Sequence, residues 1–267
     1  MKLSYKVALA VLAIVAVGFV TDALATPHMN GAVVKTRLWN DCPISVLNVI
    51  NNYPAQIQFD ESQLICFGWA NLHNWTFSAD GGATPAVLMN GDSFGFAATL
   101  TISGGNVNGA EAGLRLGPWW SQDTDGRFNV RIPDGEIACF GGVLPFFSFT
   151  GNFGIHYVAG EPIRLEVHYN PYHNTAAFPG AVQYRCYWQG VWYDSGWLAF
   201  GNCTPGEEWH GCYGIMDDAR AGGYAQHRLT NGLLPADVIS NFYDICWTEA
   251  PVPTVPSTWG KVKGLYR

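Results

Sequence analysis

The chain has 267 residues, with 21 acidic and 14 basic side chains and a net charge of −7. Aromatic residues make up 14% and charged residues only 13%, against about 25% charged residues in a typical soluble domain. The large apolar content argues against disorder, because it can build a core. No lysine occurs between Lys35 and Lys261, and acidic residues are in excess, so a phosphate-binding surface for nucleic acid is disfavoured.

The N-terminus has the three parts of an export signal. Lys2 and Lys6 supply positive charge, residues 7–20 form an apolar run, and Ala23 and Ala25 offer a small-residue cleavage site. The apolar run is shorter than the roughly 20 residues of a membrane-spanning helix. We therefore expect residues 1–25 to be a signal peptide and the protein to be periplasmic or extracellular. An uncleaved N-terminal anchor, which would bring membrane contact, is the alternative.

Seven cysteines fit an oxidising compartment, and their odd number leaves at least one thiol free or paired between chains. Cys203 and Cys212 bracket a short loop with Pro and Gly, which predicts a local disulfide. A disulfide from Cys42 or Cys66 to Cys246 would join the two ends of the domain.

Cys139 and Cys186 lie in strand-like runs and are expected to be buried, where a thiol behaves as a small hydrophobe. The chain has no Cys-x-x-Cys and no Cys/His spacing typical of zinc sites. We therefore expect no metal and no cofactor.

Alternation of apolar and polar residues with period two predicts strands through most of the chain. It is cleanest in residues 93–103 and in residues 163–169, where Arg164, Glu166 and His168 would face away from the core. Further strands are expected at residues 32–38, 64–69, 74–78, 182–188, 192–200, 213–216 and 223–229. Many short strands separated by Gly, Pro, Asn and Asp turns predict an all-β, two-sheet antiparallel β-sandwich.

The centre of the chain contains the strongest local hairpin signal, Asp125-Gly126 between apolar runs. After this turn Arg127, Asn129 and Arg131 alternate with apolar residues. This pattern predicts a half-buried strand with a polar, hydrogen-bonding outer face.

The remaining expectations concern the end of the chain and the domain division. A short helix is expected over residues 235–243, and the Pro-rich residues 249–267 read as an extended tail. No internal repeat or linker interrupts the middle. We therefore expect one domain over residues 30–248.

A resemblance supports this fold. The runs Ala-Gly-Leu-Arg-Leu at 112–116, Pro-Trp-Trp at 118–120, Asp-Gly-Arg-Phe at 125–128, Gly-Glu-Ile-Ala at 135–138 and Gly-Ile-Met-Asp-Asp-Ala-Arg at 214–220 look like those of uncharacterised secreted bacterial proteins. In strand pattern these resemble the concanavalin A-like lectin/glucanase superfamily, which implies a jelly roll of two curved antiparallel sheets. That fold hosts lectins, hydrolases, lyases and structural modules, so the resemblance does not choose among them.

A sugar-binding face requires aromatic platforms together with side chains that hydrogen-bond to hydroxyl groups. Adjacent strand residues point to opposite faces, so Trp119 and Trp120 cannot both lie in the core of a sandwich. The candidate ligand-binding residues are Trp119, Trp120, Arg127, Asn129, Arg164, Arg185 and Trp197. We expect the arginines to lie together on one solvent-facing sheet surface.

Catalytic residues are less evident. Glycoside hydrolysis uses two carboxylates across a cleft, and laminarinase-like members of the superfamily place them as Glu-x-Asp-x-x-Glu, which this chain lacks. Glu136 stands alone, whereas Glu166 and His168 share one strand face. These three are weak catalytic candidates, and a surface ion pair of Glu166 with Arg164 or Arg185 is the simpler interpretation.

Three functions remain open. The first is a secreted, non-catalytic, lectin-like β-sandwich that binds glycan. The second is a structural or interaction subunit of a bacterial cell-surface or membrane-associated assembly, with a surface or membrane protein as its partner. The third is a polysaccharide hydrolase or lyase. Exposed aromatic residues that line a groove would favour the first, and converging carboxylates would favour the third.

Overall fold

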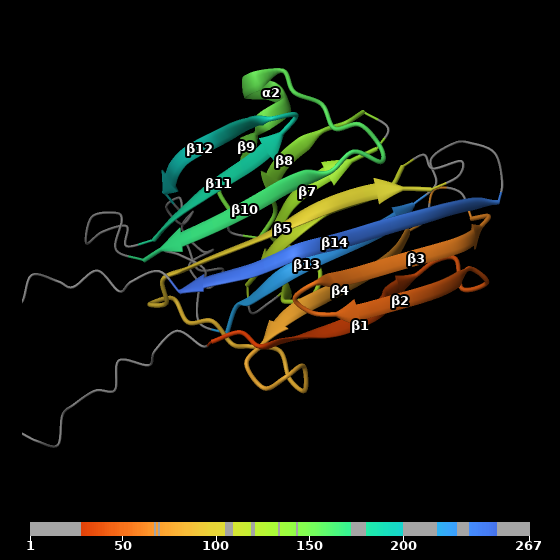
Figure 1. The fold of residues 1–267 in the computed structure, drawn as a ribbon, viewed down its shortest axis with the longest axis horizontal. Helices are drawn as coiled ribbons and strands as arrows, with labels where there is room; N and C mark the ends of the chain where they lie inside the picture. The colour runs from red at the N-terminus through yellow and green to blue at the C-terminus, as the bar shows by residue number, and fades with distance from the viewer. Residues whose placement is uncertain are drawn as a thin grey trace, which may run out of the picture.

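The computed structural model describes residues 28–66, 68, 70–104, 109–118, 121–132, 134–142, 144–171, 180–199, 218–228 and 235–249. Within these residues the chain forms two seven-stranded antiparallel sheets packed face to face (Figure 1). The protein is therefore an all-β, two-sheet antiparallel β-sandwich of the jelly-roll type, which confirms the fold class expected from the sequence. Among these residues no helix is long and apolar enough to cross a membrane.

We call the two layers sheet A and sheet B. In spatial order, sheet A contains β1 (Gly31–Asn40), β4 (Ala70–Ser78), β13 (Arg220–Arg228), β6 (Glu111–Gly117), β7 (Arg127–Arg131), β8 (Ile137–Phe140) and β9 (Phe147–Ser148). Sheet B contains β12 (Val191–Ala199), β11 (Ala181–Trp188), β10 (Ile163–Asn170), β5 (Phe94–Ser103), β14 (Ala236–Glu249), β3 (Gln56–Leu64) and β2 (Val46–Asn52). The chain passes from one sheet to the other seven times, which ties the two layers together.

The period-two pattern explains how each sheet faces the core. On β10 the residues Ile163, Leu165, Val167 and Tyr169 are buried between the sheets, while the residues between them are only partly buried on the outer face. Aromatic rings from both sheets meet in the core; the Phe77 ring of β4, for example, lies 5.1 Å from the Trp247 ring of β14. Such edge-on aromatic contacts add to the hydrophobic stabilisation.

Two expectations about secondary structure are wrong. Residues 235–243 are not a helix, because β14 runs through them with Ala236, Val238, Ser240 and Phe242 facing inward at strand spacing. Residues 65 and 66 are not part of a strand, because β3 ends at Leu64, and residues 67 and 69 of that expected strand lie outside the described residues. The expected strand at 213–216 and residues 1–27 and 250–267 lie outside the described part of the chain. The one short helix among the described residues is α2 (Phe149–Phe153), which begins at the Ser148 N-cap.

The disulfide expectation also needs correction. Cys42 is bonded to Cys66, with 5.5 Å between their Cα atoms, and Cys246 is a free thiol. A bond from Cys246 to either is excluded because its sulfur lies on the outer face of sheet B, where it accepts a hydrogen bond from Arg164. Cys139 and Cys186 are buried, as expected. Cys203 and Cys212 lie outside the described residues.

Candidate functional site

The side of sheet A that faces away from sheet B carries rows of polar side chains across adjacent strands. The strand register places Asn74 of β4 beside Tyr224 of β13, and Tyr224 beside Gly113 of β6, which in turn pairs with Asn129 of β7. The next row contains Thr76, Gly222, Arg115 and Arg127 in the same strand order. Four strands thus bring residues far apart in the sequence into one polar area, which we call the sheet A site.

This polar area is closed off from solvent. The side chains of Asn74, Arg115, Asn129 and Tyr224 are at most 1% exposed. Each has at least one buried polar atom without a hydrogen-bond partner: Asn74 Oδ1, Arg115 Nε and Nη1, both amide atoms of Asn129, and the Tyr224 hydroxyl. An unsatisfied buried polar group costs about 1–3 kcal/mol, so this concentration of unpaired atoms in one place marks a site that a ligand or water would complete.

Arg115 has the most unusual environment of these residues. Its Nη2 donates a hydrogen bond to Thr76 Oγ1 at 2.9 Å, and no carboxylate forms an ion pair with it among the described residues. Burial lowers the pKa of Arg115 to about 10, so the guanidinium remains charged at neutral pH. A buried, charged guanidinium with two free donor nitrogens is well suited to a planar anion such as a carboxylate.

Arg127 holds the neighbouring part of the site together. It forms an ion pair with Glu111, donates to Gln226 Oε1 at 3.1 Å and lies over the Tyr224 ring, 4.7 Å from its centroid. The ring of Trp39 of β1, a residue that is 42% exposed, also lies beside this guanidinium, with its centroid 5.7 Å away. Burial raises the pKa of Tyr224, and the charge of Glu111 adds to the effect, so the phenol stays protonated and can donate a hydrogen bond.

A turn at residues 121–126 folds against the edge of the sheet A site. Lys35 Nζ of β1 lies 2.6 Å from Asp123 Oδ2, and Asn74 Nδ2 donates to the Asp123 carbonyl at 3.0 Å. Gln122 donates to Asp218 at 2.8 Å, just before β13. These contacts fasten the turn between the strands that flank the site, so a ligand would enter by displacing part of it.

The expected ligand-binding residues are divided between the two sides of the sandwich. Arg127 and Asn129 lie in the sheet A site, but Arg164, Arg185 and Trp197 lie on the outer face of sheet B. The expectation of one shared surface for the arginines is therefore wrong, because β7 and β10–β11 belong to different sheets. Trp119 and Trp120 lie outside the described residues.

The weak catalytic candidates lie in ion pairs outside the sheet A site. Glu136 pairs with Arg131 at 2.9 Å. Glu166 pairs with Arg164 and Arg185, each at 3.1 Å, and its other contact is His168 at 3.5 Å. Although partial burial alone would raise it, the pKa of Glu166 is lowered by the hydrogen bonds from His168 and Arg164 and by the charges of the arginines. An ionised, paired Glu166 is not prepared to act as a general acid.

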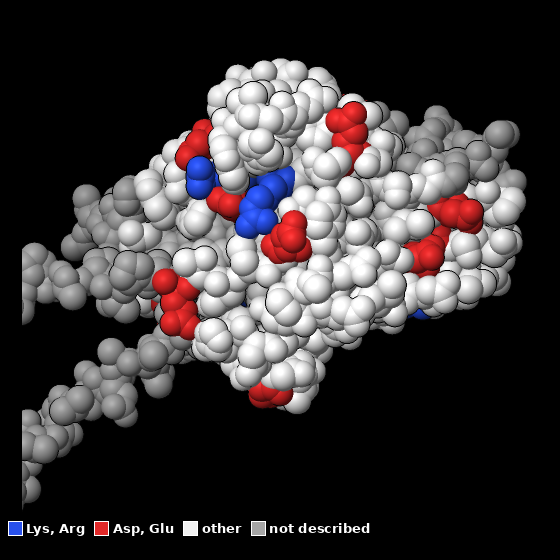
Figure 2. Space-filling model, viewed as in Figure 1, with Lys and Arg blue, Asp and Glu red and all other residues white. Residues whose placement is uncertain are grey.

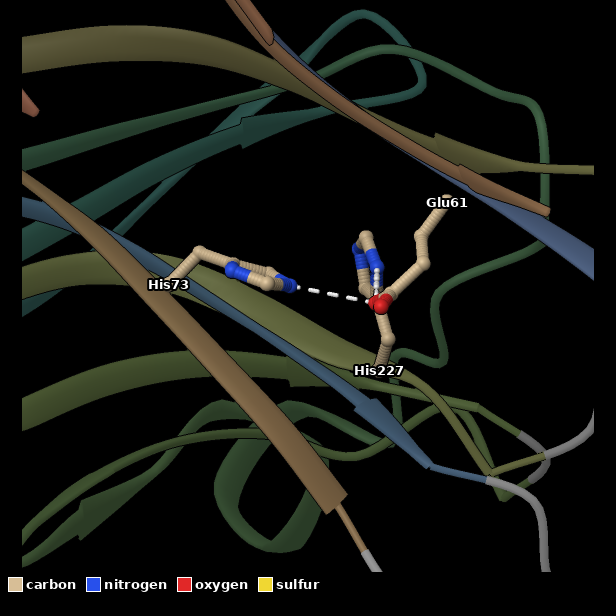
Figure 3. A group of neighbouring side chains, drawn as sticks. All are labelled: Glu61, His73 and His227. Atoms are coloured by element: carbon tan, nitrogen blue, oxygen red, sulfur yellow. Dashed lines mark hydrogen bonds and ion pairs between the residues drawn. The ribbon is translucent and has the colours of Figure 1, made fainter. Parts of the chain in front are cut away.

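A second polar group lies inside the sandwich, where Glu61 of β3 meets His73 of β4 and His227 of β13 (Figure 3). All three side chains are fully buried, and Glu61 Oε2 lies 3.1 Å from His73 Nε2 and 3.0 Å from His227 Nδ1. Two imidazoles and a carboxylate form a donor set that zinc accepts, so we tested whether the site fits a metal ion.

The tautomer of His73 argues against a metal ion. The backbone N–H of Arg37 donates to His73 Nδ1 at 3.0 Å, so the ring proton must be on Nε2, from which it is donated to Glu61. A metal ion on Nε2 would force the ring proton onto Nδ1. Two N–H donors, Nδ1 of His73 and the backbone of Arg37, would then face each other. The cluster therefore fits a hydrogen-bonded network, in which Arg37 at 3.4 Å balances the charge of Glu61.

This internal network connects the two sheets. Glu61 Oε1 also accepts from Ser45 and Asn71, each at 2.5 Å, and His227 Nε2 lies 2.9 Å from Ser240 Oγ of β14. Although burial alone would raise it, hydrogen bonds from His227 and His73 hold the pKa of Glu61 well below its usual range. Every partner of the carboxylate is thus a donor within the fold, which makes the network structural.

Sequence reasoning missed several residues of the sheet A site. They are Trp39, Asn74, Glu111, Arg115, Tyr224 and Gln226. The signal that could have found some of them is the alternation in residues 111–117 and 220–228, which places Arg115 and Tyr224 on the face opposite Leu114 and Ala225. Their burial could not be read from that alternation, because it depends on how the rest of the chain covers the sheet.

Comparisons with known proteins give weak likenesses. No family model matches the chain, and no curated protein matches it in sequence. Among solved structures, an alginate lyase from Corynebacterium sp. matches with a TM-score of 0.46 and 9% identity over 84% of this chain and 96% of its own. An alginate lyase from Klebsiella pneumoniae matches with a TM-score of 0.45 and 8% identity over 76% and 84%.

A protein of unknown function from Shewanella oneidensis MR-1 matches with a TM-score of 0.40 and 9% identity, over 89% of this chain and 87% of that one. At these TM-scores and identities, the likenesses establish neither a shared family nor a shared activity.

Proposed function

We propose that this protein binds an acidic polysaccharide at the sheet A site. The observation that supports this most directly is Arg115, a buried guanidinium whose Nε and Nη1 have no partner and which forms no ion pair with any described carboxylate. A carboxylate group on a sugar would accept both hydrogen bonds in the fork geometry that arginine favours. The ligand would thereby neutralise a charge that the fold leaves unpaired.

The neighbours of Arg115 suit the rest of a sugar ring. The unpaired amide of Asn129, the free Oδ1 of Asn74 and the Tyr224 hydroxyl offer both donors and acceptors to hydroxyl groups. Trp39 is half-exposed at the β1 side of the site and offers an aromatic surface for an apolar sugar face. The Cys42–Cys66 disulfide also supports the proposed periplasmic or extracellular location.

A second candidate function is cleavage of the same polysaccharide by β-elimination, and Tyr224 is the observation that favours it. Elimination next to a uronate carboxylate requires a cation to neutralise that carboxylate, a base for the C5 proton and an acid for the departing oxygen. Arg115 would serve the first role and the protonated Tyr224 the third. Glu111 forms an ion pair with Arg127, whose guanidinium lies over the Tyr224 ring, and it is the carboxylate that we assign as the base.

Binding is tested by isothermal titration of an oligouronate into wild type, Arg115→Met and the control Arg228→Met, which removes an exposed arginine from the end of β13. We expect binding by wild type and by the control and its loss in Arg115→Met. Equal affinity in all three proteins, or no binding by wild type, would refute the proposed function.

The elimination chemistry is tested separately by the ultraviolet absorbance of the C4–C5 double bond that it creates. Tyr224→Phe removes only the hydroxyl and should abolish product formation while retaining most of the affinity. A wild-type protein that binds the oligouronate but forms no unsaturated product would contradict the second candidate and leave the first intact.

A further inference from the structure

The opposite side of the sandwich carries a second polar surface, over β10, β11 and β12 of sheet B. Figure 2 shows that most of the basic atoms visible on this side gather over these strands together with acidic atoms, while most of the remaining surface is uncharged. Strand alternation and register put its members on one face: Arg164, Glu166, His168, Gln183, Arg185, Tyr187, Trp192, Asp194 and Trp197. We call this surface the β10–β12 face.

The charges of this face balance one another. Glu166 lies between Arg164 and Arg185, at 3.1 Å from each, and Arg185 also lies 3.3 Å from Asp194. Two guanidinium groups thus face two carboxylates. In contrast to the sheet A site, with its unpaired Arg115, this face offers no excess charge to an ionic ligand.

The same contacts hold the polar groups in fixed positions. Gln183 Nε2 donates to both oxygens of Asp194 at 2.9 Å, and Asp194 Oδ1 also accepts from the backbone of Gly196 at 2.7 Å. Arg185 lies over the Trp192 ring, 4.5 Å from its centroid. A ligand would therefore meet acceptors whose conformational entropy is already restricted.

Large aromatic rings flank the network and remain accessible. Tyr187, Trp192 and Trp197 are 40%, 44% and 37% exposed. The Tyr187 and Trp192 ring centroids are 5.2 Å apart and their planes are inclined by 47°, so the two rings are neighbours on this face. Aromatic faces carry negative charge density that attracts the C–H groups of a sugar ring.

We propose that the β10–β12 face is a second binding site, which takes a neutral polysaccharide chain. Sugar rings would lie on the Tyr187–Trp192 surface, and their hydroxyl groups would donate to Asp194 and Glu166. A protein partner fits less well, because protein interfaces are depleted of charged residues at their centre, where this face has its ionic network. The site is separate from the sheet A site, since the two lie on opposite sides of the sandwich.

The test is retention of the purified protein on insoluble neutral polysaccharides, namely cellulose, chitin and mannan, followed by tryptophan fluorescence with cellohexaose. We expect retention on at least one of them and roughly tenfold weaker binding in Trp192→Ala. Phe146→Ala is the matched control, because it removes an aromatic ring that is 70% exposed outside this face. Asp194→Ala is the second variant and should weaken binding through the lost acceptor without removing a ring.

Two results would overturn the proposal. The first is no retention of wild type on any of the three, or equal retention of wild type, Trp192→Ala and Asp194→Ala. The second is a concentration-dependent dimer that Trp192→Ala abolishes, which would make the face an interface between two copies of this chain. Arg115→Met should bind the neutral polysaccharide normally, so failure of the sheet A site and failure of this one are distinguishable.

Discussion

Replacing Arg115 by methionine should separate the stability of the unliganded protein from its ligand binding. The long, unbranched methionine side chain fills much of the space of the arginine stem without a charge. The substitution removes two unpaired donors, Nε and Nη1, from a fully buried position. It also removes the hydrogen bond from Nη2 to Thr76 Oγ1.

When no ligand is present, the cost of the two unpaired donors should on average exceed the stabilisation by the lost hydrogen bond. Each unsatisfied buried donor costs about 1–3 kcal/mol, whereas a hydrogen bond to a charged group stabilises by about 1.5–3 kcal/mol. Removing two such donors gains about 2–6 kcal/mol and losing one such bond costs about 1.5–3 kcal/mol, so the unliganded variant should lie between about 1 kcal/mol less and about 4 kcal/mol more stable than wild type. Two charge-assisted hydrogen bonds to a carboxylate would be lost on binding, which weakens the affinity on the order of 100-fold.

Urea denaturation of both proteins, with and without an oligouronate, measures both effects. We expect the ligand to raise the free energy of unfolding of wild type and to leave Arg115→Met nearly unchanged. A variant that is more than about 2 kcal/mol less stable than wild type and still binds the ligand normally would show that Arg115 serves the fold. The unpaired donors of Arg115 would then not be a ligand site.

The internal network should make stability depend on pH. Burial lowers the pKa of His73, so this imidazole binds a proton more readily in the unfolded chain than in the folded protein. The free energy of unfolding should therefore decrease as the pH falls below 6.5, by at most ~1.4 kcal/mol per pH unit for this group. The lowered pKa of Glu61 acts in the same direction below pH 4.5. Urea unfolding at several pH values checks both effects in wild type and His73→Gln, with exposed His156→Gln as the control. A free energy of unfolding that does not change with pH in wild type would contradict the assignment. Gly126→Ala should destabilise by roughly 3 kcal/mol or more, because its Cβ would lie 1.9 Å from the Leu116 carbonyl oxygen at a φ of +74°. Gly81→Ala has the same φ and no atom within 4 Å, so it should cost only about 1 kcal/mol, and equal melting temperatures of the two variants would contradict the clash. Lys35→Met should loosen the turn at residues 121–126 and speed ligand association by up to about fivefold in stopped-flow fluorescence. The limit follows because a partly exposed ion pair such as Lys35–Asp123 contributes about 1 kcal/mol or less. Slower association would show that the turn does not restrict entry of the ligand.

Much of the fold follows from period-two alternation, and the exceptions have physical reasons. Residues 163–169 form a strand as expected, because every second side chain is apolar and packs between the sheets. The strand β3 was missed because Glu61 occupies an inward position where the pattern requires an apolar residue. Donors from His73, His227, Asn71 and Ser45 make that position tolerable, and the first three of these residues come from the other sheet.

The candidate site was predictable only in part. The outward positions of Arg127 and Asn129 followed from the apolar spacing around Phe128. The grouping of Arg127 with Arg164 and Arg185 failed because alternation gives the face of a strand and not the sheet to which it belongs. The pairing of Cys42 with Cys66 likewise depends on how the loops around β1 and β4 meet in space.

The most direct test of the sheet A site is a crystal structure of the protein with an oligouronate. A sugar carboxylate within hydrogen-bonding distance of Arg115 Nε and Nη1, with a hydroxyl group near Asn129 or Tyr224, is the result that we expect. An oligouronate bound only elsewhere on the molecule, with Arg115 still unpaired under saturating ligand, would show that Arg115 does not bind the sugar carboxylate.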